Sequence, residues 1–350
     1  MDFALTDDQK AVLDLAARIF AGRPDTRDPF DATTWAQLAG AGLLGVALAD
    51  DVGGAGQGLL ELCALLTAAG AAAAPVPLWA VSFAALAIDQ LGSAEQRRAV
   101  LPEVVRGRAF VAPAFSEPET DDARAPGTRI RADGRLEGVK TYVPAALRAS
   151  HLVVPARRGD GAVALYLVAA ADTGIEPQVG TTGEPVGLVT LAGAPAEPLG
   201  GPDDLDWLLD RAAIGLCALE LGICEHVLRL TASYTTTRVQ FERPIATFQA
   251  VAQRAADAYI DVESIRLTML EAAWRLAQGL PAAREVAVAK FFAAEAGQRV
   301  TYAAQHLHGG IGFDLDYGLA RYYPLSKQIE LTLGGANAHL ARLGALLAGG

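Results

Sequence analysis

The chain has 350 residues, which is long for one domain and suits two or three cooperating ones. Of these residues 52% are apolar, so the chain can build a large core, and its composition excludes a disordered protein. The net charge of −11 argues against nucleic acid as a partner, because an acidic surface repels phosphate backbones. A local basic site can still bind a phosphorylated small molecule.

Residues 1–108 are predicted to be helical. Thr6 and Gln9 form a capping-box pattern ahead of an amphipathic stretch, so a helix is expected to begin there. A glycine cluster at 53–58 interrupts the helical pattern, and prolines at 75 and 77 end the helix that follows it. Further helices are expected over 35–44, 59–74 and 80–91, and from the cap at Ser93 to about Gly107.

Residues 109–202 change character, because Val, Thr, Gly and Pro become more frequent. Short alternating runs appear at 129–131, 136–139, 151–154 and 163–168, and turn residues such as Asp133-Gly134 separate them. This pattern predicts a compact antiparallel β domain, a small barrel or sandwich.

Residues 203–350 return to helix. Four long segments with apolar faces are expected, at about 203–237, 245–278, 281–307 and 321–347. Their length and amphipathic pattern predict a four-helix bundle. The predicted fold class is therefore mainly α with a central β domain.

The cysteines and the N-terminus bear on the cellular compartment. The three cysteines form no C-x-x-C pair, so we predict that Cys63, Cys217 and Cys224 pack in the core rather than form disulfides. The opening MDFALTDDQK has neither a basic n-region nor an apolar h-region, and no apolar run reaches the ~18 residues of a membrane span. We therefore expect a cytoplasmic protein without membrane association.

The segment from Tyr234 to Val251 places a short polar turn between two long predicted helices. It carries Arg238 and Arg243 within R-V-Q-F-E-R-P-I-A-T-F-Q-A. Guanidinium groups near helix ends suit a diphosphate, with which they pair bidentately. Arginines at a helix C-terminus also interact favourably with the helix dipole, and on spacing alone this second interpretation is favoured.

A second segment, Q-H-L-H-G-G-I-G-F from Gln305 to Phe313, places three glycines after a helix. Such glycines allow a ligand to approach the backbone closely, or they form a left-handed C-cap, which is the favoured interpretation on this motif alone. The chain has no strand-linked G-x-G-x-x-G, P-loop, G-x-S-x-G or H-E-x-x-H. We expect no metal, since His306, His308 and His339 lack zinc-site spacing.

Taken together, these segments resemble the acyl-CoA dehydrogenase family. The family's R-x-Q-F-G-R-P-I-x-x-F-Q-A reads RVQFERPIATFQA here, and its Q-x-x-G-G-x-G reads QHLHGGIGF. FSEP at 115–118 stands where the family has a T-E-P turn, and EGVKTYV at 137–143 where it has N-G-x-K-x-W-I. MDFALTDDQ and WAQLAGAGLLGVALADDVGGAGQGLLEL look like its N-terminal domain. The resemblance covers essentially the whole chain in the right order.

The resemblance implies a fold and a chemistry. The fold has an N-terminal helical domain, a middle β domain and a C-terminal four-helix bundle, which agrees with the segmentation above. The chemistry is FAD-dependent α,β-desaturation of an acyl-CoA thioester, in which a carboxylate removes the α-proton and the flavin takes the β-hydride. An electron-transfer flavoprotein or a similar acceptor is the implied electron partner.

The resemblance also carries roles to individual residues of the bundle. Arg238, Phe241 and Gln249 match positions that contact FAD. Gln305, Gly309 and Gly310 match the segment that, in this family, reaches the FAD of a neighbouring subunit.

Other matched positions lie earlier in the chain. Phe115 and Ser116 match the turn that faces the flavin, and Tyr142 matches an aromatic residue near the isoalloxazine ring. Asp210 and Arg211 begin the helix that looks like the one lining the CoA and acyl channel, so they are candidate substrate-binding residues.

The catalytic base is where the sequence departs most from the family. The usual base is a Glu in a turn before the last helix, but here residues 331–336 contain no carboxylate. A minority of the family places the base near the start of the first bundle helix, at the position of Ala212. Glu220, two turns later, and Glu330, just before the usual turn, are weak candidates for a displaced base. Glu220 is equally interpreted as a helix-face carboxylate.

Three further departures concern the flavin. Residues 119–122 replace a G-x-G-S-D run that helps to bind FAD, and Pro144 replaces a Thr expected near flavin N5, so a donor is lost. Glu242 replaces a glycine and would repel a diphosphate.

Short members of the family without a base occur as one half of heterotetramers, in which a longer homologous chain supplies the base. The first hypothesis is therefore a heteromeric subunit of this kind, acting in steroid or branched acyl-CoA catabolism. The alternatives are a homotetramer with a displaced base, a catalytically silent structural subunit, or a different flavin chemistry on the same fold. Acyl chain length and shape, and CoA versus a carrier protein, are left open.

Overall fold

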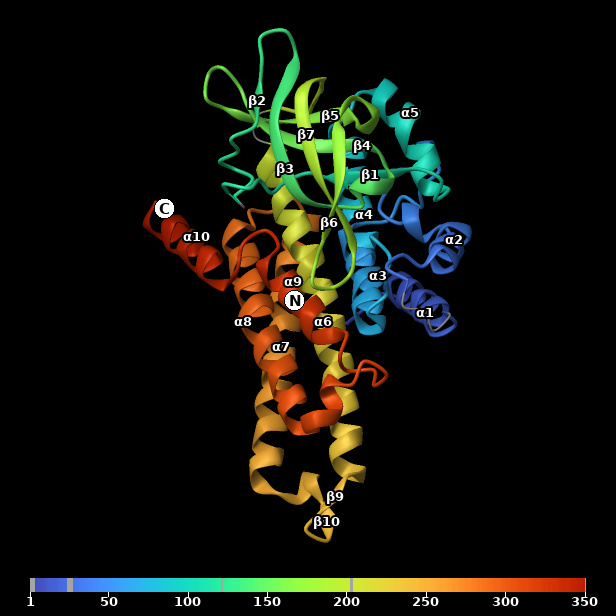
Figure 1. Ribbon diagram of the computed structural model, residues 1–350, viewed down its shortest axis with the longest axis vertical. Helices are drawn as coiled ribbons and strands as arrows, with labels where there is room; N and C mark the ends of the chain where they lie inside the picture. Colours follow the sequence, from blue (N-terminus) through green and yellow to red (C-terminus); the bar gives the residue numbers. More distant parts are fainter. Residues whose placement is uncertain (1–3, 24–27, 121, 202–203, 350) are drawn as a thin grey trace. The chain divides into compact units, whose positions relative to one another are not determined.

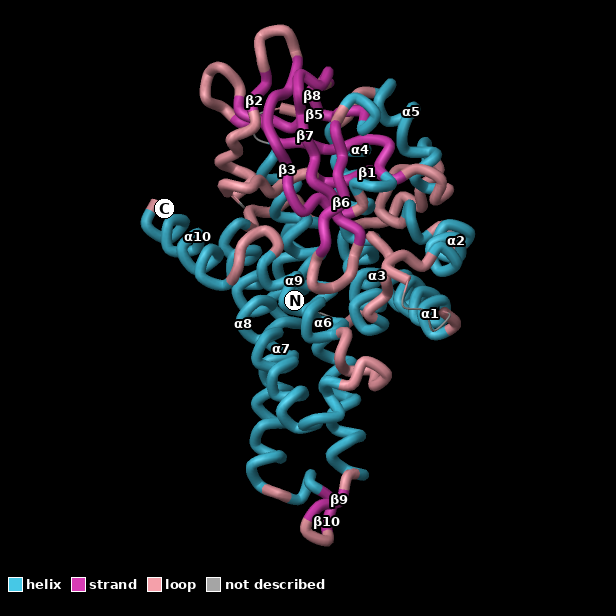
Figure 2. Tube along the Cα trace, in the orientation of Figure 1, coloured by secondary structure: helices cyan, strands magenta, loops and turns pink. Residues whose placement is uncertain are grey.

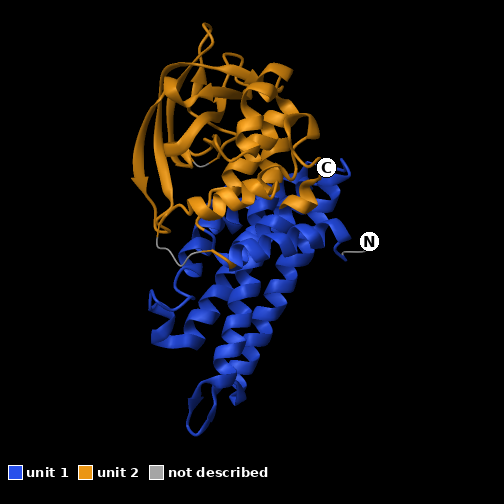
Figure 3. Cartoon of the chain, turned by 90° about the vertical axis from the view of Figure 1, so that its right-hand side faces the viewer, with its two compact units in different colours: residues 1–21, 63–74, 213–350 blue, residues 22–62, 75–212 orange. Residues whose placement is uncertain are grey.

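A computed structural model describes residues 4–23, 28–120, 122–201 and 204–349. The chain divides into two compact units (Figure 3). Unit 1 comprises 1–21, 63–74 and 213–350, and unit 2 comprises 22–62 and 75–212. The first three residues of the opening motif, Asp121, and the predicted boundary at 202/203 lie outside the described residues. The limits of the three predicted domains, 1–108, 109–202 and 203–350, remain predictions.

The helices of unit 2 begin at side-chain caps. Asp31 accepts a hydrogen bond from the backbone N–H of Thr34 at 2.9 Å and starts α2 (Ala32–Gly40). Ser93 and Gln96 form the predicted capping box at the start of α5 (Ala94–Val105). The helix expected over 35–44 ends at Gly40, because Gly42 turns left-handed ahead of a short 3-10 turn, η1 (Leu43–Gly45). Between them lies the almost wholly buried α4 (Leu78–Leu91).

The strands of unit 2 form one eight-stranded sheet in the described chain (Figure 2). Its order is β6-β7-β3-β2-β4-β5-β8, and β1 also pairs with β4. The predicted strands are confirmed in position, but the sheet is mixed rather than antiparallel, because β1 and β2 both run parallel to β4. The strands are β1 (Phe110–Pro113), β2 (Arg129–Ile130), β3 (Arg135–Pro144), β4 (Ala149–Arg157), β5 (Val163–Ala169), β6 (Gly174–Val179), β7 (Pro185–Pro195) and β8 (Glu197–Leu199).

Unit 1 is helical. Its α1 (Asp7–Ala21) starts with the predicted capping box, in which Thr6 and Gln9 exchange hydrogen bonds of 3.1 and 3.2 Å. The long helices α6 and α7 are joined at their ends by a two-stranded hairpin of β9 and β10 (Figure 1). The elements are the part of α3 (Leu59–Ala72) from Cys63 on, α6 (Asp204–Thr237) from Ala213 on, β9 (Val239–Gln240), β10 (Arg243–Pro244), α7 (Gln249–Ala277), α8 (Ala283–His308), α9 (Tyr322–Leu331) and α10 (Ala336–Ala348).

The segment predicted as one helix over 321–347 is two helices. Leu333 and Gly334 both adopt left-handed backbone angles, with φ of +59° and +91°, and so end α9 before α10 begins.

Two glycines bring α3 and α6 into backbone contact within unit 1. A Cβ atom on Gly70 would lie 2.0 Å from the carbonyl oxygen of Leu219, and one on Gly222 would lie 1.9 Å from the carbonyl oxygen of Thr67. No side chain fits at either position, so each glycine lets the other helix approach.

Within the ranges described, no helix combines the length and the apolar character that crossing a bilayer requires.

Candidate functional site

The first motif lies in the hairpin between α6 and α7. Phe241 and Glu242 have φ of +52° and +66°, the pair of left-handed residues that a tight two-residue turn requires. The turn pushes Phe241 outward, and 86% of its surface is exposed. Arg238 follows the end of α6, and its exposed side chain forms no ion pair with the described residues. Gln249, at the start of α7, is also exposed.

The second motif ends α8. Gly309 has φ of 65° and ψ of −140°, a combination that favours glycine, and both Gly309 and Gly310 expose their backbone. The side-chain amide of Gln305 serves this turn, because it donates to the Gly312 carbonyl at 3.0 Å and accepts from the Phe313 N–H at 3.3 Å. Gln305 therefore fixes the shape of the loop that presents the glycines.

Tyr234 and His308 join the two motifs, a contact that was not predicted from the sequence, although both residues lie in the motif segments. Their rings stack with centroids 4.4 Å apart, and the Tyr234 hydroxyl donates to the His308 carbonyl at 3.4 Å. The backbone N–H of Arg238 in turn donates to the Tyr234 carbonyl at 2.8 Å. The two motifs therefore lie at the same end of unit 1. The available sequence signal for this contact was Tyr234, an aromatic residue one helical turn before Arg238.

This end of unit 1 fits the diphosphate of a dinucleotide. It offers an exposed guanidinium without an ion-pair partner in the described chain, an exposed aromatic ring, and glycine backbone that a ligand can approach. Glu242 adds one carboxylate to the same turn, which lowers the local positive charge. Arg243 is held elsewhere, because its guanidinium lies 4.2 Å from the centre of the Phe248 ring.

The other predicted cofactor residues lie in unit 2. Phe115 is buried after β1, and Ser116 is half-buried. The Ser116 carbonyl accepts from the Thr141 N–H at 2.9 Å, which brings the turn beside Tyr142 of β3. Tyr142 is 37% exposed and left-handed, with φ of +54°, at a bulge in the pairing of β3 with β7.

Gln178 on β6 holds this bulge and was not anticipated. Its side-chain oxygen accepts from the Tyr142 N–H at 2.7 Å and from the Thr141 hydroxyl at 3.2 Å. The hydrogen bonds offset the strain of a non-glycine residue in the left-handed region.

The two candidate substrate residues, Asp210 and Arg211, lie in the part of α6 that belongs to unit 2. They do not begin the helix as expected, because α6 already starts at Asp204, about two turns earlier. Arg211 donates to the Trp207 carbonyl at 3.1 Å and lies 4.2 Å from the centre of the Trp207 ring. Burial lowers the pKa of Arg211 to about 10, against the opposing charge of Asp210. Asp210 is buried, 3.7 Å from the guanidinium of Arg124, which also binds Asp206 at 2.6 Å.

The two candidate bases lie in unit 1, in different surroundings. Glu220 has no exposed surface, and its Oε1 accepts from the Ser326 hydroxyl at 2.6 Å and from the Cys224 thiol at 3.4 Å. Burial raises the pKa of Glu220 to about 7, although the bond from Ser326 opposes the shift. Glu330 is half-buried and ion-paired with Lys327.

Lys290 controls the turn between α9 and α10. It is wholly buried, and its ammonium donates to the carbonyls of Ile329 and Glu330 at 3.0 Å each and of Gly334 at 3.2 Å. Burial lowers the pKa of Lys290 to about 8. A lysine within the apolar run A-V-A-K-F-F-A-A was the sequence signal for such a buried cation.

Three known proteins are similar to this chain over nearly its whole length. Acyl-CoA dehydrogenase FadE27 of Mycobacterium tuberculosis is 42% identical over 334 residues, which are 91% of this chain and 89% of the relative. A variant of the Tcur3481-Tcur3483 steroid ACAD has a TM-score of 0.93 and 42% identity, over 98% of both chains. The ChsE4-ChsE5 complex from Mycobacterium tuberculosis has a TM-score of 0.92 and 36% identity, over 99% of both chains.

Two family descriptions match most of the chain. "Acyl-CoA dehydrogenase, N-terminal domain" matches residues 6–108, and "Acyl-CoA dehydrogenase, C-terminal domain" matches residues 201–346. The matches confirm the resemblance drawn from the motifs and the fold class expected from it. The chain belongs to the acyl-CoA dehydrogenase family, FAD-dependent oxidoreductases that act on CH–CH groups.

Proposed function

We propose that this chain is one subunit of a heteromeric acyl-CoA dehydrogenase whose catalytic base comes from a homologous partner subunit. The observation that carries the proposal is the turn between α9 and α10. Lys290 ties this turn in place, yet none of residues 331–336 has a carboxylate. Removal of an α-proton needs a general base within reach of the substrate, so the base is expected in the partner.

The proposed reaction is α,β-desaturation of an acyl-CoA thioester. The thioester carbonyl acidifies the α-carbon for the base, and FAD, when bound, supplies the acceptor for the hydride from the β-carbon. This chain contributes binding: Arg238 offers positive charge to the diphosphate, and the exposed backbone of Gly309 and Gly310 allows close approach. We propose an electron-transfer flavoprotein or a similar acceptor as the next electron carrier.

The proposed substrate is a steroid side-chain or branched acyl-CoA. Support comes from the Tcur3481-Tcur3483 protein, which is named a steroid ACAD and shares 42% identity over nearly the whole chain. That protein and ChsE4-ChsE5 are each named for two chains, which supports a heteromeric assembly. Asp210 and Arg211 are the proposed substrate-binding residues, about two turns into α6, the helix expected to line the acyl channel.

The alternatives are less well supported by the surroundings of the two glutamates. A homomeric enzyme with a displaced base would need Glu220 or Glu330 to reach the substrate. Glu220 has no exposed surface, and Glu330 is engaged by Lys327. A catalytically silent subunit would have no use for the exposed guanidinium of Arg238, which forms no ion pair with the described residues.

Flavin reduction tests the proposal. Purified alone and mixed with a steroid side-chain acyl-CoA without oxygen, the chain should leave the visible absorption of bound flavin unchanged. Purified together with a homologous chain of the same organism that carries a carboxylate in the corresponding turn, it should show bleaching of the flavin. Replacing that partner carboxylate by Gln should abolish the bleaching.

The matched control is the double variant Glu220→Gln/Glu330→Gln, which should keep the rate of bleaching of the complex. Bleaching by the chain alone, lost on either glutamate substitution, would instead establish a displaced base. A complex that keeps full activity and full flavin content after Arg238→Ala would identify this chain as a structural subunit.

A further inference from the structure

A buried ion pair lies directly behind the two segments of unit 2 that are expected to face the flavin. Glu117 follows Ser116, and Lys140 precedes Thr141. The Lys140 ammonium donates to the Glu117 carboxylate at 2.7 Å, and Lys140 has no exposed surface. The ion pair therefore links the same two segments as the backbone hydrogen bond from Thr141 to Ser116, through the residues next to these two in the chain.

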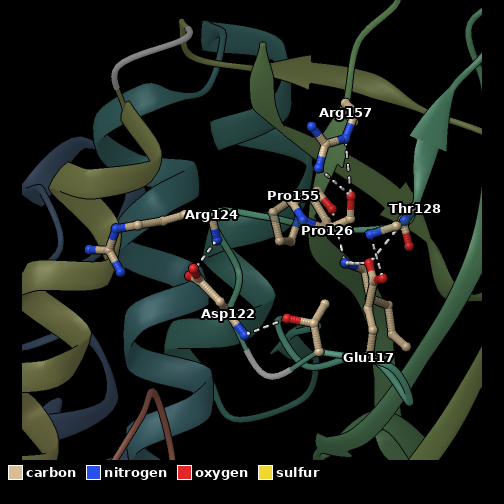
Figure 4. A network of polar contacts seen from close by, with 10 residues as sticks. Glu117, Asp122, Arg124, Pro126, Thr128, Pro155 and Arg157 are labelled. Atoms are coloured by element: carbon tan, nitrogen blue, oxygen red, sulfur yellow. Dashed lines mark hydrogen bonds and ion pairs between the residues drawn. The ribbon is translucent and has the colours of Figure 1, made fainter. Parts of the chain in front are cut away.

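Glu117 also binds the far end of the loop that it begins, at Gly127 and Thr128. Its carboxylate accepts from the Gly127 N–H at 2.6 Å and from the Thr128 N–H at 3.1 Å (Figure 4). Beside it, the Arg157 guanidinium donates to the Pro126 carbonyl at 3.2 and 3.3 Å. The end of this loop is thus hydrogen-bonded both to β4, through Arg157, and to Glu117 at the start of the loop.

Lys140 reaches β4 directly. Besides Glu117, its ammonium donates to the Pro155 carbonyl at 3.0 Å. Three stretches of chain, namely the turn after β1, the bulge of β3 and the middle of β4, therefore meet at one buried ammonium group. At the same bulge the Tyr142 N–H donates to the Gln178 side chain at 2.7 Å.

The electrostatics make this pair an unfavourable choice for stability alone. Burial lowers the pKa of Lys140 to about 8, while Glu117 opposes the shift. Burial raises the pKa of Glu117, but the hydrogen bond and charge of Lys140, together with hydrogen bonds from Thr128, outweigh it and leave that pKa below its usual value. Apolar residues of similar volume often fill such a site with equal or better stability, whereas a charged pair fixes one geometry.

We propose that Glu117 and Lys140 are positioning residues for the flavin: they hold the Phe115–Ser116 turn and the Thr141–Tyr142 bulge at the spacing that the isoalloxazine ring requires. The inference rests on the proposed function, in which these two segments face FAD. It predicts that loss of this pair changes the flavin environment, whereas loss of another ion pair of unit 2 lowers stability without such a change.

The test compares Lys140→Met with Arg97→Met in the assembled complex. Arg97 forms another ion pair of unit 2 with a buried carboxylate, that of Asp89 at 2.9 Å, and its hydrogen bonds go to Asp51 and Asp89. It thus controls for lost stability. Lys140→Met should weaken FAD binding by about tenfold, as loss of a supporting contact typically does, and shift the visible band of the bound flavin. Arg97→Met should lower the Tm and leave both flavin readouts unchanged.

Two further variants keep the test informative. Glu117→Gln retains the shape of the side chain, so it should fold and show the same flavin shift if Lys140→Met fails to fold. The double variant Glu117→Gln/Lys140→Met should be no worse than Lys140→Met alone, since the two residues act as one unit.

The outcomes separate the inference from the function. Equal FAD affinity and an unchanged flavin band in Lys140→Met and Glu117→Gln, in a complex that binds FAD and desaturates its substrate, would refute the inference alone. A wild-type complex without FAD would refute the proposed function together with it.

Discussion

Glu117 and Glu220 show how partners decide the charge of a buried carboxyl group. Glu117 receives an ammonium and two backbone N–H groups, so its pKa falls although burial opposes this. Glu220 receives only a hydroxyl and a thiol, and no hydrogen-bond partner reaches its second oxygen in the described chain. Its pKa accordingly rises to about 7, and near neutral pH it is close to half protonated.

The raised pKa of Glu220 predicts a pH-dependent stability. Between its usual pKa of 4.5 and the folded value of about 7, the folded chain binds the proton more tightly than the unfolded chain does. The free energy of unfolding should therefore fall as pH rises through this window, by about 3 kcal/mol from this group alone. Urea unfolding of wild type and Glu220→Gln across the window measures the effect.

The Gln variant should lack this loss and overtake wild type above pH 7. Parallel curves for the two proteins would contradict the assignment. Glu330→Gln is the control, since Glu330 is paired with Lys327 and only half-buried.

At the scale of elements, the turn between α9 and α10 depends on one buried ammonium group. Lys290→Met would keep the volume but leave the carbonyls of Ile329, Glu330 and Gly334 without this donor. We expect a loss of about 3 kcal/mol, because each buried acceptor left unsatisfied carries a penalty. Hydrogen exchange should accelerate at the amides of residues 329–339.

Lys327→Met is the matched control for this substitution, because Lys327 lies on α9 just before the turn and its side chain is partly exposed. It should change exchange in that stretch very little. Equal acceleration in both variants would show that helix α9, rather than the Lys290 contacts, limits the opening of the turn.

Local rules predicted the elements well where local interactions decide them. The capping boxes at Thr6 and Ser93 formed as expected, since their partners lie three residues away. The helical pattern missed the split of the last helix, although the resemblance placed a turn at 331–336 and Gly334-Gly335 was a local signal for it. The left-handed conformation of Leu333 itself has no sequence signal. That conformation is held by Lys290, more than 40 residues earlier in the chain.

The candidate site divides in the same way. Motifs that are contiguous in sequence, such as those around Arg238 and Gly309, could be found by pattern. Contacts between segments that are distant in the sequence could not be found in this way. They are the stacking of Tyr234 on His308, the hydrogen bond from Tyr142 in the bulge of β3 to Gln178, and the ion pair of Lys140 with Glu117. Their positions are set by tertiary packing.

At the scale of the whole molecule, unit 1 exposes several large apolar side chains in and next to its two motifs. Phe313, 74% exposed, and Leu315, 77% exposed, lie in the segment that follows α8, and Phe241 of the hairpin is 86% exposed. Large exposed apolar residues on one segment typically mark an interface.

The double variant Phe313→Asp/Leu315→Asp should therefore weaken assembly of the complex, by about tenfold or more, because it places charge in a surface that must be desolvated. Light scattering across a dilution series measures the change. Val179→Asp serves as control, since Val179 is a highly exposed apolar residue of unit 2 and should tolerate the charge. A complex equally stable with the Asp pair would exclude this segment from the interface.

The glycine pair of α3 and α6 affects how mutational data on this protein will look. Each helix occupies the space where the other's side chain would be, so Gly70 and Gly222 resist every substitution, alanine included. A saturation screen scored by growth will rank both positions with the cofactor residues. Neither lies in a motif assigned to FAD or substrate, and a soluble-expression readout run beside the screen will separate them from the residues of the flavin site.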